Sequence, residues 1–129
     1  MEAWLDKADG DLKAAGACAD RPEVPAWIIG FHLQQAAEKT LKGLLVLHDC
    51  EPPRLHNLDR LAQMLFDARG RSPFTGELSA SLQSHAVEDR YPLLVSAKVD
   101  RERLFTLIVP VEEGLARARE ALAEHRSKG

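Results

Sequence analysis

Residues 25–48 read PAWIIGFHLQQAAEKTLKGLLVLH, and this stretch decides the fold. Placed on an α-helix at about 100° per residue, its apolar side chains fill one wide arc. They are Ile29, Leu33, Ala36, Ala37, Leu41, Leu44, Leu45 and Leu47. Because this arc is wider than a single neighbour could cover, it predicts a central helix that packs against several others.

The opposite side of this helix carries a polar strip that is roughly 120° wide. Its members are His32, Gln35, Glu38, Lys39 and Lys42. One interpretation is a solvated face, on which Glu38 and Lys42 form a favourable i,i+4 pair. The other is a row of hydrogen-bonding groups that faces a ligand or a partner. Ile28, Phe31 and Val46 border the strip, which favours a subunit contact over a purely solvated surface.

Four further amphipathic segments predict helices around the central one. We expect them at about residues 2–19, 58–70 and 76–89, and from residue 101 onward. Asn57, Thr75 and Asp100 are suited to be N-caps, and Gly70 is suited to end the third helix. Pro110 lies inside the last pattern and should kink that helix. With no alternating strand pattern of useful length, the prediction is all-α, an antiparallel up-and-down bundle of four to five helices.

Size and composition limit the classes of protein to consider. The 129 residues suit one domain, residues 1–129, and a hydrophobic fraction of 45% is enough for a core. The formal charge of −3 gives no general attraction to nucleic acid, so such a contact needs a local patch. We expect no leader peptide and no membrane span, and Cys18 and Cys50 suggest no disulfide framework. A cytoplasmic protein without a cofactor or a metal site is the simplest expectation, because the spacing of the Cys and His residues matches no zinc finger.

Two other short segments contain residues that could carry chemistry. The segment PPRLHNLDR, residues 52–60, places His56 just before a predicted N-cap, where it could act as a general acid or base or could fix the turn. Arg90 and Tyr91 precede Pro92 and could form a phosphate clamp and a base-stacking platform. They could equally tie this loop to the neighbouring helix.

Several of these segments together resemble the HEPN family of helical domains. They are EAWLDKADGDLKAA (2–15), FHLQQAAEKTLKGLLVLH (31–48), HNLDRL (56–61), AVEDRYP (86–92) and the closing amphipathic helix. The resemblance spans nearly the whole chain and implies a four- or five-helix bundle, usually a homodimer. Family members often accompany a small nucleotidyltransferase or act in toxin–antitoxin and defence systems.

Many HEPN proteins are metal-independent ribonucleases in which an arginine precedes a histidine by a short spacing. Arg90 lies in about the corresponding region of this chain, but the histidine positions hold Val95, Ser96 and Ala97. No neighbouring side chain there can transfer the proton. Arg119 and His125 have the spacing, but they lie on different sides of a helix near the C-terminus.

The resemblance and the residues together predict a non-catalytic, homodimeric HEPN protein. It would bind a nucleotide or RNA, or a partner nucleotidyltransferase, with a place in a toxin–antitoxin or defence pair. The residues expected at this binding site are Gln35, Lys39, Lys42, His56, Arg90 and Tyr91, and none is expected to be catalytic. One alternative is a ribonuclease that uses a displaced histidine, His56 or His85. Another is a dimeric scaffold without a ligand.

Overall fold

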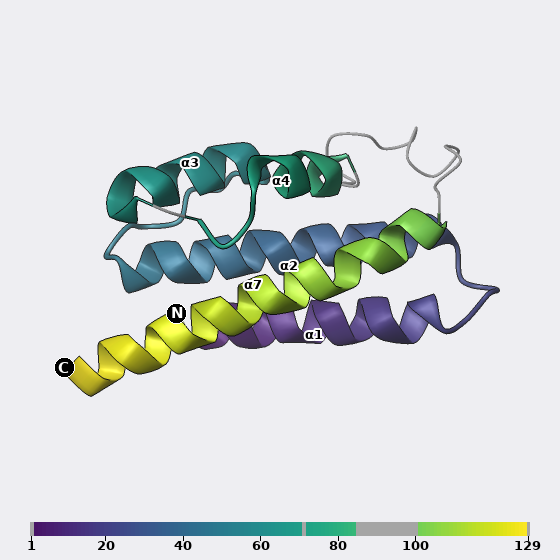
Figure 1. Ribbon diagram of the computed structural model, residues 1–129, viewed down its shortest axis with the longest axis horizontal. Helices are drawn as coiled ribbons and strands as arrows, with labels where there is room; N and C mark the ends of the chain where they lie inside the picture. The colour runs from purple at the N-terminus through teal and green to yellow at the C-terminus, as the bar shows by residue number, and fades with distance from the viewer. Residues whose placement is uncertain (1, 71, 85–100, 129) are drawn as a thin grey trace.

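The computed structural model describes residues 2–70, 72–84 and 101–128, which form five helices and their connections (Figure 1). The helices are α1 (Glu2–Ala19), α2 (Ala26–Leu47), α3 (Leu58–Arg69), α4 (Gly76–Gln83) and α7 (Arg101–Lys128). No strand occurs within these three ranges, and the predicted all-α class is confirmed. None of these helices combines the length and the hydrophobicity that a membrane crossing requires.

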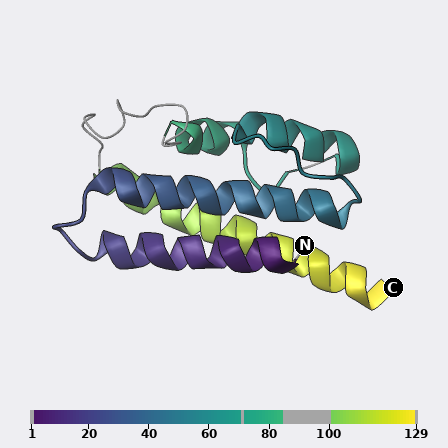
Figure 2. The same cartoon turned by 180° about the vertical axis from the view of Figure 1, so that it is seen from behind.

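Helix α2 is the central element of the bundle. It contacts α1, α3, α4 and α7, which confirms the prediction drawn from its wide apolar arc. Helices α1 and α7 lie on one side of α2, and α3 and α4 lie on the other (Figures 1 and 2). Helices α1 and α2 form an antiparallel hairpin, and α7 runs antiparallel to α1 (Figure 1).

The core forms from the apolar positions that the helical periodicity marks. All eight members of the α2 arc are buried, and so are Leu5, Ala8, Leu12, Ala15 and Ala19 of α1. Burial of this apolar surface is the main favourable contribution to folding. In α3, by contrast, Ala68 is exposed. It lies in the last turn of α3, beyond the buried residues Leu58, Leu61 and Leu65.

The predicted caps explain where the short helices begin and end. The Asn57 Oδ1 atom accepts a hydrogen bond from the Arg60 N–H at 3.1 Å, and the Thr75 Oγ1 atom accepts one from the Leu78 N–H at 3.1 Å. Gly70 adopts φ = 80° at the end of α3, a conformation that glycine adopts without steric cost. The predicted cap at Asp100 and the predicted extension of α4 over residues 85–89 lie outside the described residues.

Helix α7 continues through Pro110, so the β-favouring run TLIV, residues 106–109, is helical. Arginines attach this helix to α1 at both ends. The Arg101 guanidinium donates hydrogen bonds to the backbone carbonyls of Cys18, Ala19, Arg21 and Val24 at 2.6–3.2 Å. At the other end, Arg126 donates a 2.8 Å hydrogen bond to Glu2, which lowers the pKa of that carboxyl below its usual value.

Candidate functional site

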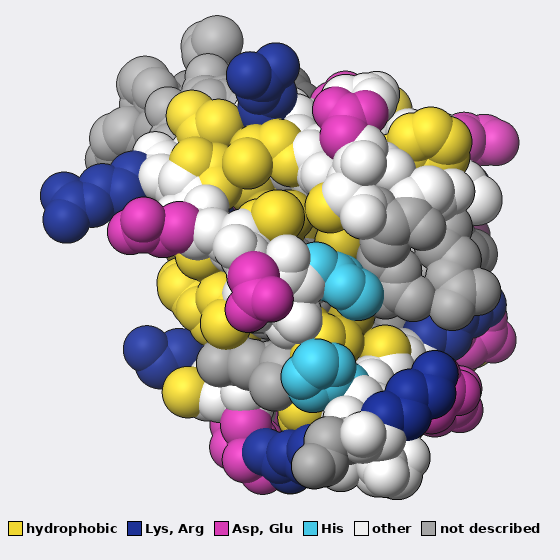
Figure 3. Space-filling view, turned by 90° about the vertical axis from the view of Figure 1, so that its left-hand side faces the viewer, with side chains coloured by type: hydrophobic (Ala, Val, Ile, Leu, Met, Phe, Trp, Pro, Cys, Tyr) yellow, Lys and Arg dark blue, Asp and Glu magenta, His cyan; other side chains and the backbone are white. Residues whose placement is uncertain are grey.

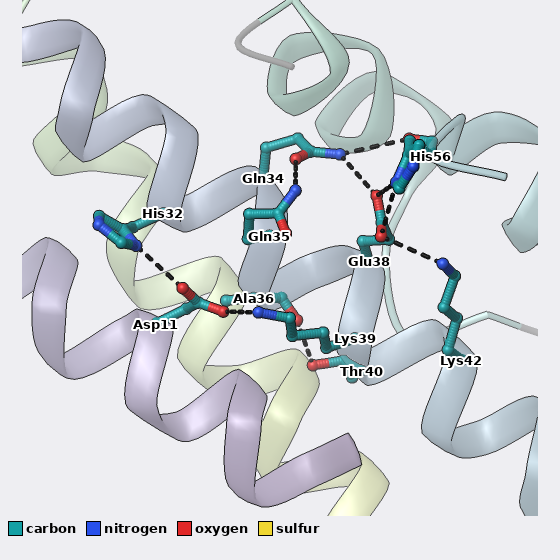
Figure 4. A network of polar contacts seen from close by, with 10 residues as sticks. All are labelled: Asp11, His32, Gln34, Gln35, Ala36, Glu38, Lys39, Thr40, Lys42 and His56. Atoms are coloured by element: carbon teal, nitrogen blue, oxygen red, sulfur yellow. Dashed lines mark hydrogen bonds and ion pairs between the residues drawn. The ribbon is translucent and has the colours of Figure 1, made fainter. Parts of the chain in front are cut away.

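The polar strip of α2 contains a buried carboxylate with three partners, shown in Figure 4. The Glu38 Oε1 atom accepts hydrogen bonds from Gln34 Nε2 and His56 Nδ1, both at 3.2 Å. The Glu38 Oε2 atom accepts one from Lys42 Nζ at 3.2 Å and lies 3.2 Å from His56 Nδ1. Gln35 joins the cluster because its Nε2 atom donates to Gln34 Oε1 at 2.8 Å. We call these five residues the Glu38 network.

The Glu38 network is mostly shielded from water, with a single open end. The side chains of Glu38 and Lys42 are 4% and 7% exposed, whereas that of His56 is 47% exposed. The Lys42 Nζ atom also lies 5.6 Å from the centre of the Trp4 ring, within the range of a cation–π contact. A fully solvated strip is therefore the wrong interpretation for Glu38 and Lys42. Burial of both partners explains why the carboxylate takes so many donors.

A second cluster lies on the side of α2 that faces α1. One oxygen of the Asp11 carboxylate is 2.9 Å from His32 Nδ1, and the other accepts a hydrogen bond from Lys39. We call these three residues the Asp11 network. Its side chains are 12–27% exposed. The two networks therefore share one arrangement, in which a carboxylate binds one lysine and the Nδ1 atom of one histidine (Figure 4).

The Glu38 carboxylate determines what His56 can do chemically. An ionised carboxylate only accepts hydrogen bonds, so the Nδ1 atom of His56 carries the proton and donates it. The Nε2 atom has no hydrogen-bond partner among the described residues. It can accept a hydrogen bond in neutral imidazole and donate one in imidazolium. A second contact fixes the backbone at this position, because Gln34 Nε2 donates to the His56 carbonyl oxygen at 3.3 Å.

The structure brings together only some of the six residues predicted at the site. Gln35, Lys42 and His56 belong to the Glu38 network, and Lys39 belongs to the Asp11 network one turn away. Both lysines are paired with carboxylates of their own chain, so neither is a free cation. Arg90 and Tyr91 lie outside the described residues, as does His85. Arg119 contacts Asp6 of α1 at 3.5 Å.

Sequence reasoning missed two members of these networks, Gln34 and Asp11. Asp11 lies between Ala8 and Ala15 on the buried face of α1, so its i−3 and i+4 neighbours already marked it as a charge within an apolar stripe. Gln34 precedes Glu38 by one helical turn and Glu38 precedes Lys42 by another, so all three lie on one ridge of α2. These two spacings are the signals that could have identified them.

The described residues show whether a metal could be held, and Figure 3 shows the charges at one end of the bundle. Within the described ranges, no group of three or more His, Cys, Asp and Glu residues is arranged to hold a metal ion. Figure 3 shows one end of the bundle, where Lys and Arg side chains alternate with Asp and Glu around hydrophobic ones. This end therefore has no single-sign surface that would attract a polyanion.

Comparisons with known proteins place the chain in a family. A sequence model described as the HEPN domain matches residues 1–124 of the 129. Comparisons with curated proteins and with solved structures gave no match. The family match covers nearly the whole chain and agrees with the all-α bundle, so the chain belongs to the HEPN family.

Proposed function

We propose that this chain is a non-catalytic HEPN protein that binds a phosphate-bearing ligand, a nucleotide or RNA, at the open end of the Glu38 network. The observation that carries the proposal is the arrangement of His56, whose Nδ1 atom is held by a buried carboxylate while its side chain is 47% exposed and its Nε2 atom has no partner among the described residues. A histidine fixed in this way is preoriented to hydrogen-bond a ligand oxygen, so little side-chain entropy is lost on binding. From the sequence alone we add Arg90 as a phosphate contact and Tyr91 as a base-stacking contact of the proposed site.

The charges of the two networks favour a specific contact with a short ligand over a general attraction to nucleic acid. The Lys39 charge is offset by Asp11 and the Lys42 charge by Glu38, so the two networks are neutral while their histidines are neutral. A long RNA gains most of its affinity from unpaired Lys and Arg. We therefore favour a short ligand, such as a nucleotide or an RNA end, over duplex or extended RNA.

The absence of cleavage is proposed from the sequence around Arg90. Residues 95–97 are valine, serine and alanine, and none of them can act as a general acid or base. The rival function is a ribonuclease that uses His56, and one observation favours it. A carboxylate bonded to Nδ1 with Nε2 left open is the arrangement in which imidazole serves as a general base in hydrolases.

The proposal predicts that His56→Ala lowers the affinity for the ligand about tenfold, since one directed hydrogen bond to a charged group is lost. Calorimetric titration with ATP, GTP and a short single-stranded RNA measures this change. His56→Ala also removes one donor from the buried Glu38 carboxylate, so the melting temperature should fall by a few degrees while the protein stays folded. The matched control is His125→Ala, which removes an exposed histidine near the end of α7.

Incubation of the protein with RNA and a chelator separates the proposal from its rivals. We expect intact RNA. Cleavage that His56→Ala or Arg90→Ala abolishes would contradict the proposal and establish the ribonuclease. If ATP, GTP and the short RNA all fail to bind while the protein remains a dimer, the binding proposal is wrong and the scaffold alternative is favoured.

Homodimerisation and a nucleotidyltransferase partner are further parts of this proposal, as is a cytoplasmic role in a toxin–antitoxin or defence pair. The support for a dimer is the partial exposure of Ile28, Phe31 and Val46 along the border of the polar strip. Apolar side chains at such a border fit a subunit contact. Sedimentation equilibrium measures the mass directly, and a monomer at micromolar concentration would contradict the dimer.

A further inference from the structure

The side of α7 that points away from the bundle has an unusual pattern of side chains. Successive exposed positions, spaced three or four residues apart, form one continuous stripe along the helix. They are Glu102, Phe105, Val109, Glu112, Ala116, Glu120 and Ala123, which we call the α7 outer face. Phe105 and Val109 are 44% and 56% exposed and lie one turn apart. Together with Leu55 and Phe66, they are the large hydrophobic side chains left exposed among the described residues.

A groove of about 460 Å³ runs between α1 and α7 beside this face. Leu12, Gly16, Leu115 and Ala116 provide its apolar lining, and its polar lining consists of Asp9, Lys13, Glu112 and Arg119. Ala116 belongs to both the groove and the outer face. The exposed stripe and the groove are therefore one continuous surface, of a shape that can receive an elongated apolar element.

The basic side chains of this surface, Lys13 and Arg119, are paired with Asp9 and Asp6 of α1. Acidic side chains flank the apolar positions of the outer face, and Glu112 and Glu120 have no ion-pair partner among the described residues. Three arginines of α7 contact the body of the bundle. Arg101 binds carbonyls at the end of α1, Arg119 contacts Asp6 and Arg126 contacts Glu2. The charges that line the groove are balanced, and the unpaired negative charge of this surface lies at Glu112 and Glu120.

We propose that the α7 outer face and the adjoining groove dock an amphipathic helix of another protein, whose apolar side is flanked by lysines and arginines. Apolar anchors would enter the groove and cover Phe105 and Val109, while the basic flanks would pair with Glu112 and Glu120. A second copy of this chain would bring acidic flanks against acidic flanks. RNA and anionic lipid would be repelled for the same reason. This inference is independent of the ligand proposed at His56.

The test uses a fluorescein-labelled 18-residue peptide that is designed to be helical, with leucines on one side and lysines flanking them. Its counterpart has glutamate in place of every lysine. Fluorescence anisotropy should show binding of the lysine peptide alone, and the affinity should fall as NaCl is added because the flanking charges are exposed. Equal binding of both peptides would contradict the proposal.

Two glycines of α1 provide a matched pair of variants. A Cβ atom at either Gly16 or Gly10 would meet no other atom within 4 Å, so both positions accept a side chain. Gly16 lines the groove, whereas Gly10 is exposed outside it. Gly16→Arg fills the groove and should weaken peptide binding about tenfold. Gly10→Arg adds the same charge elsewhere and should have little effect. If Gly16→Arg and Gly10→Arg weaken binding equally, the effect comes from the added charge and not from the groove, and the proposal is overturned.

A second pair of variants tests the apolar part of the surface. Phe105→Ala should weaken the lysine peptide about tenfold, while Phe66→Ala removes a similarly exposed ring from α3 and should not. A larger loss of affinity for Phe66→Ala than for Phe105→Ala would contradict the proposal. If Gly16→Arg instead dissociates a dimer of the protein, as measured by sedimentation, the occupant is a second copy and the proposed partner is wrong.

Discussion

Replacing Glu38 by alanine is expected to lower the free energy of unfolding by about 3–5 kcal/mol. The carboxylate is 4% exposed and is the common acceptor for Gln34, Lys42 and His56. Without it, the Lys42 ammonium, whose side chain is 7% exposed, is left as a buried charge with no counter-ion. Chemical denaturation followed by circular dichroism measures this change.

Two comparisons show whether the loss comes from the buried charge. Glu113→Ala removes one partner of an exposed pair, Glu113 and Arg117 at 3.8 Å, and should cost less than about 1 kcal/mol. Combining Glu38→Leu with Lys42→Met removes both charges, and it should restore most of the stability that Glu38→Ala loses. A Glu38→Ala variant as stable as Glu113→Ala would mean that Glu38 is not buried and paired as described.

Arg101→Ala is expected to lower the free energy of unfolding by about 2 kcal/mol, the scale of hydrogen bonds made by a charged group. Its guanidinium is the only side chain among the described residues that donates to the carbonyls of Cys18, Ala19, Arg21 and Val24. The Cys18 and Arg21 carbonyls each keep one backbone hydrogen bond, from the N–H groups of Arg21 and Val24. All four carbonyls nevertheless lose a charged donor, which only water can replace. Denaturant unfolding measures the change in stability, and amide hydrogen exchange shows whether the end of α1 opens.

The Arg101→Lys variant should recover less than half of this loss, because a single ammonium cannot reproduce the planar fork of donors. Arg119→Ala is the matched control. Its guanidinium contacts Asp6 at 3.5 Å, and the two side chains are 43% and 64% exposed, so its removal should cost less than about 1 kcal/mol. Equal losses for Arg101→Ala and Arg119→Ala would contradict the special role of Arg101.

Most of the fold was predictable from the sequence because its signals are local. The apolar period of residues 25–48 placed α2 in the centre, and the predicted bounds of α1 are those observed. Asn57, Thr75 and Gly70 marked helix ends correctly, since a cap acts within a few residues of itself. Pro25, the first residue of that stretch, is the N-cap of α2.

The candidate site was less predictable because a helical wheel shows which residues share a face but not what covers that face. Glu38 and Lys42 lie on a polar strip, and only the path of the segment after α2 places His56 over them. Asp11 is distant in the sequence from His32 and Lys39, so its contacts need the α1–α2 packing. Arg101 likewise binds carbonyls about 80 residues away. The roles of Arg90 and Tyr91 stay predictions.

The proposed ligand site requires that Glu38 hold the Nδ1 atom of His56 and that the Nε2 atom stay open. Nitrogen-15 NMR of the imidazole ring observes both atoms directly, before and after addition of GTP. We predict a protonated Nδ1 in the free protein and a shift of the Nε2 resonance when GTP is added. A ring that carries its only proton on Nε2, with an Nδ1 atom insensitive to Glu38→Gln, would contradict the account.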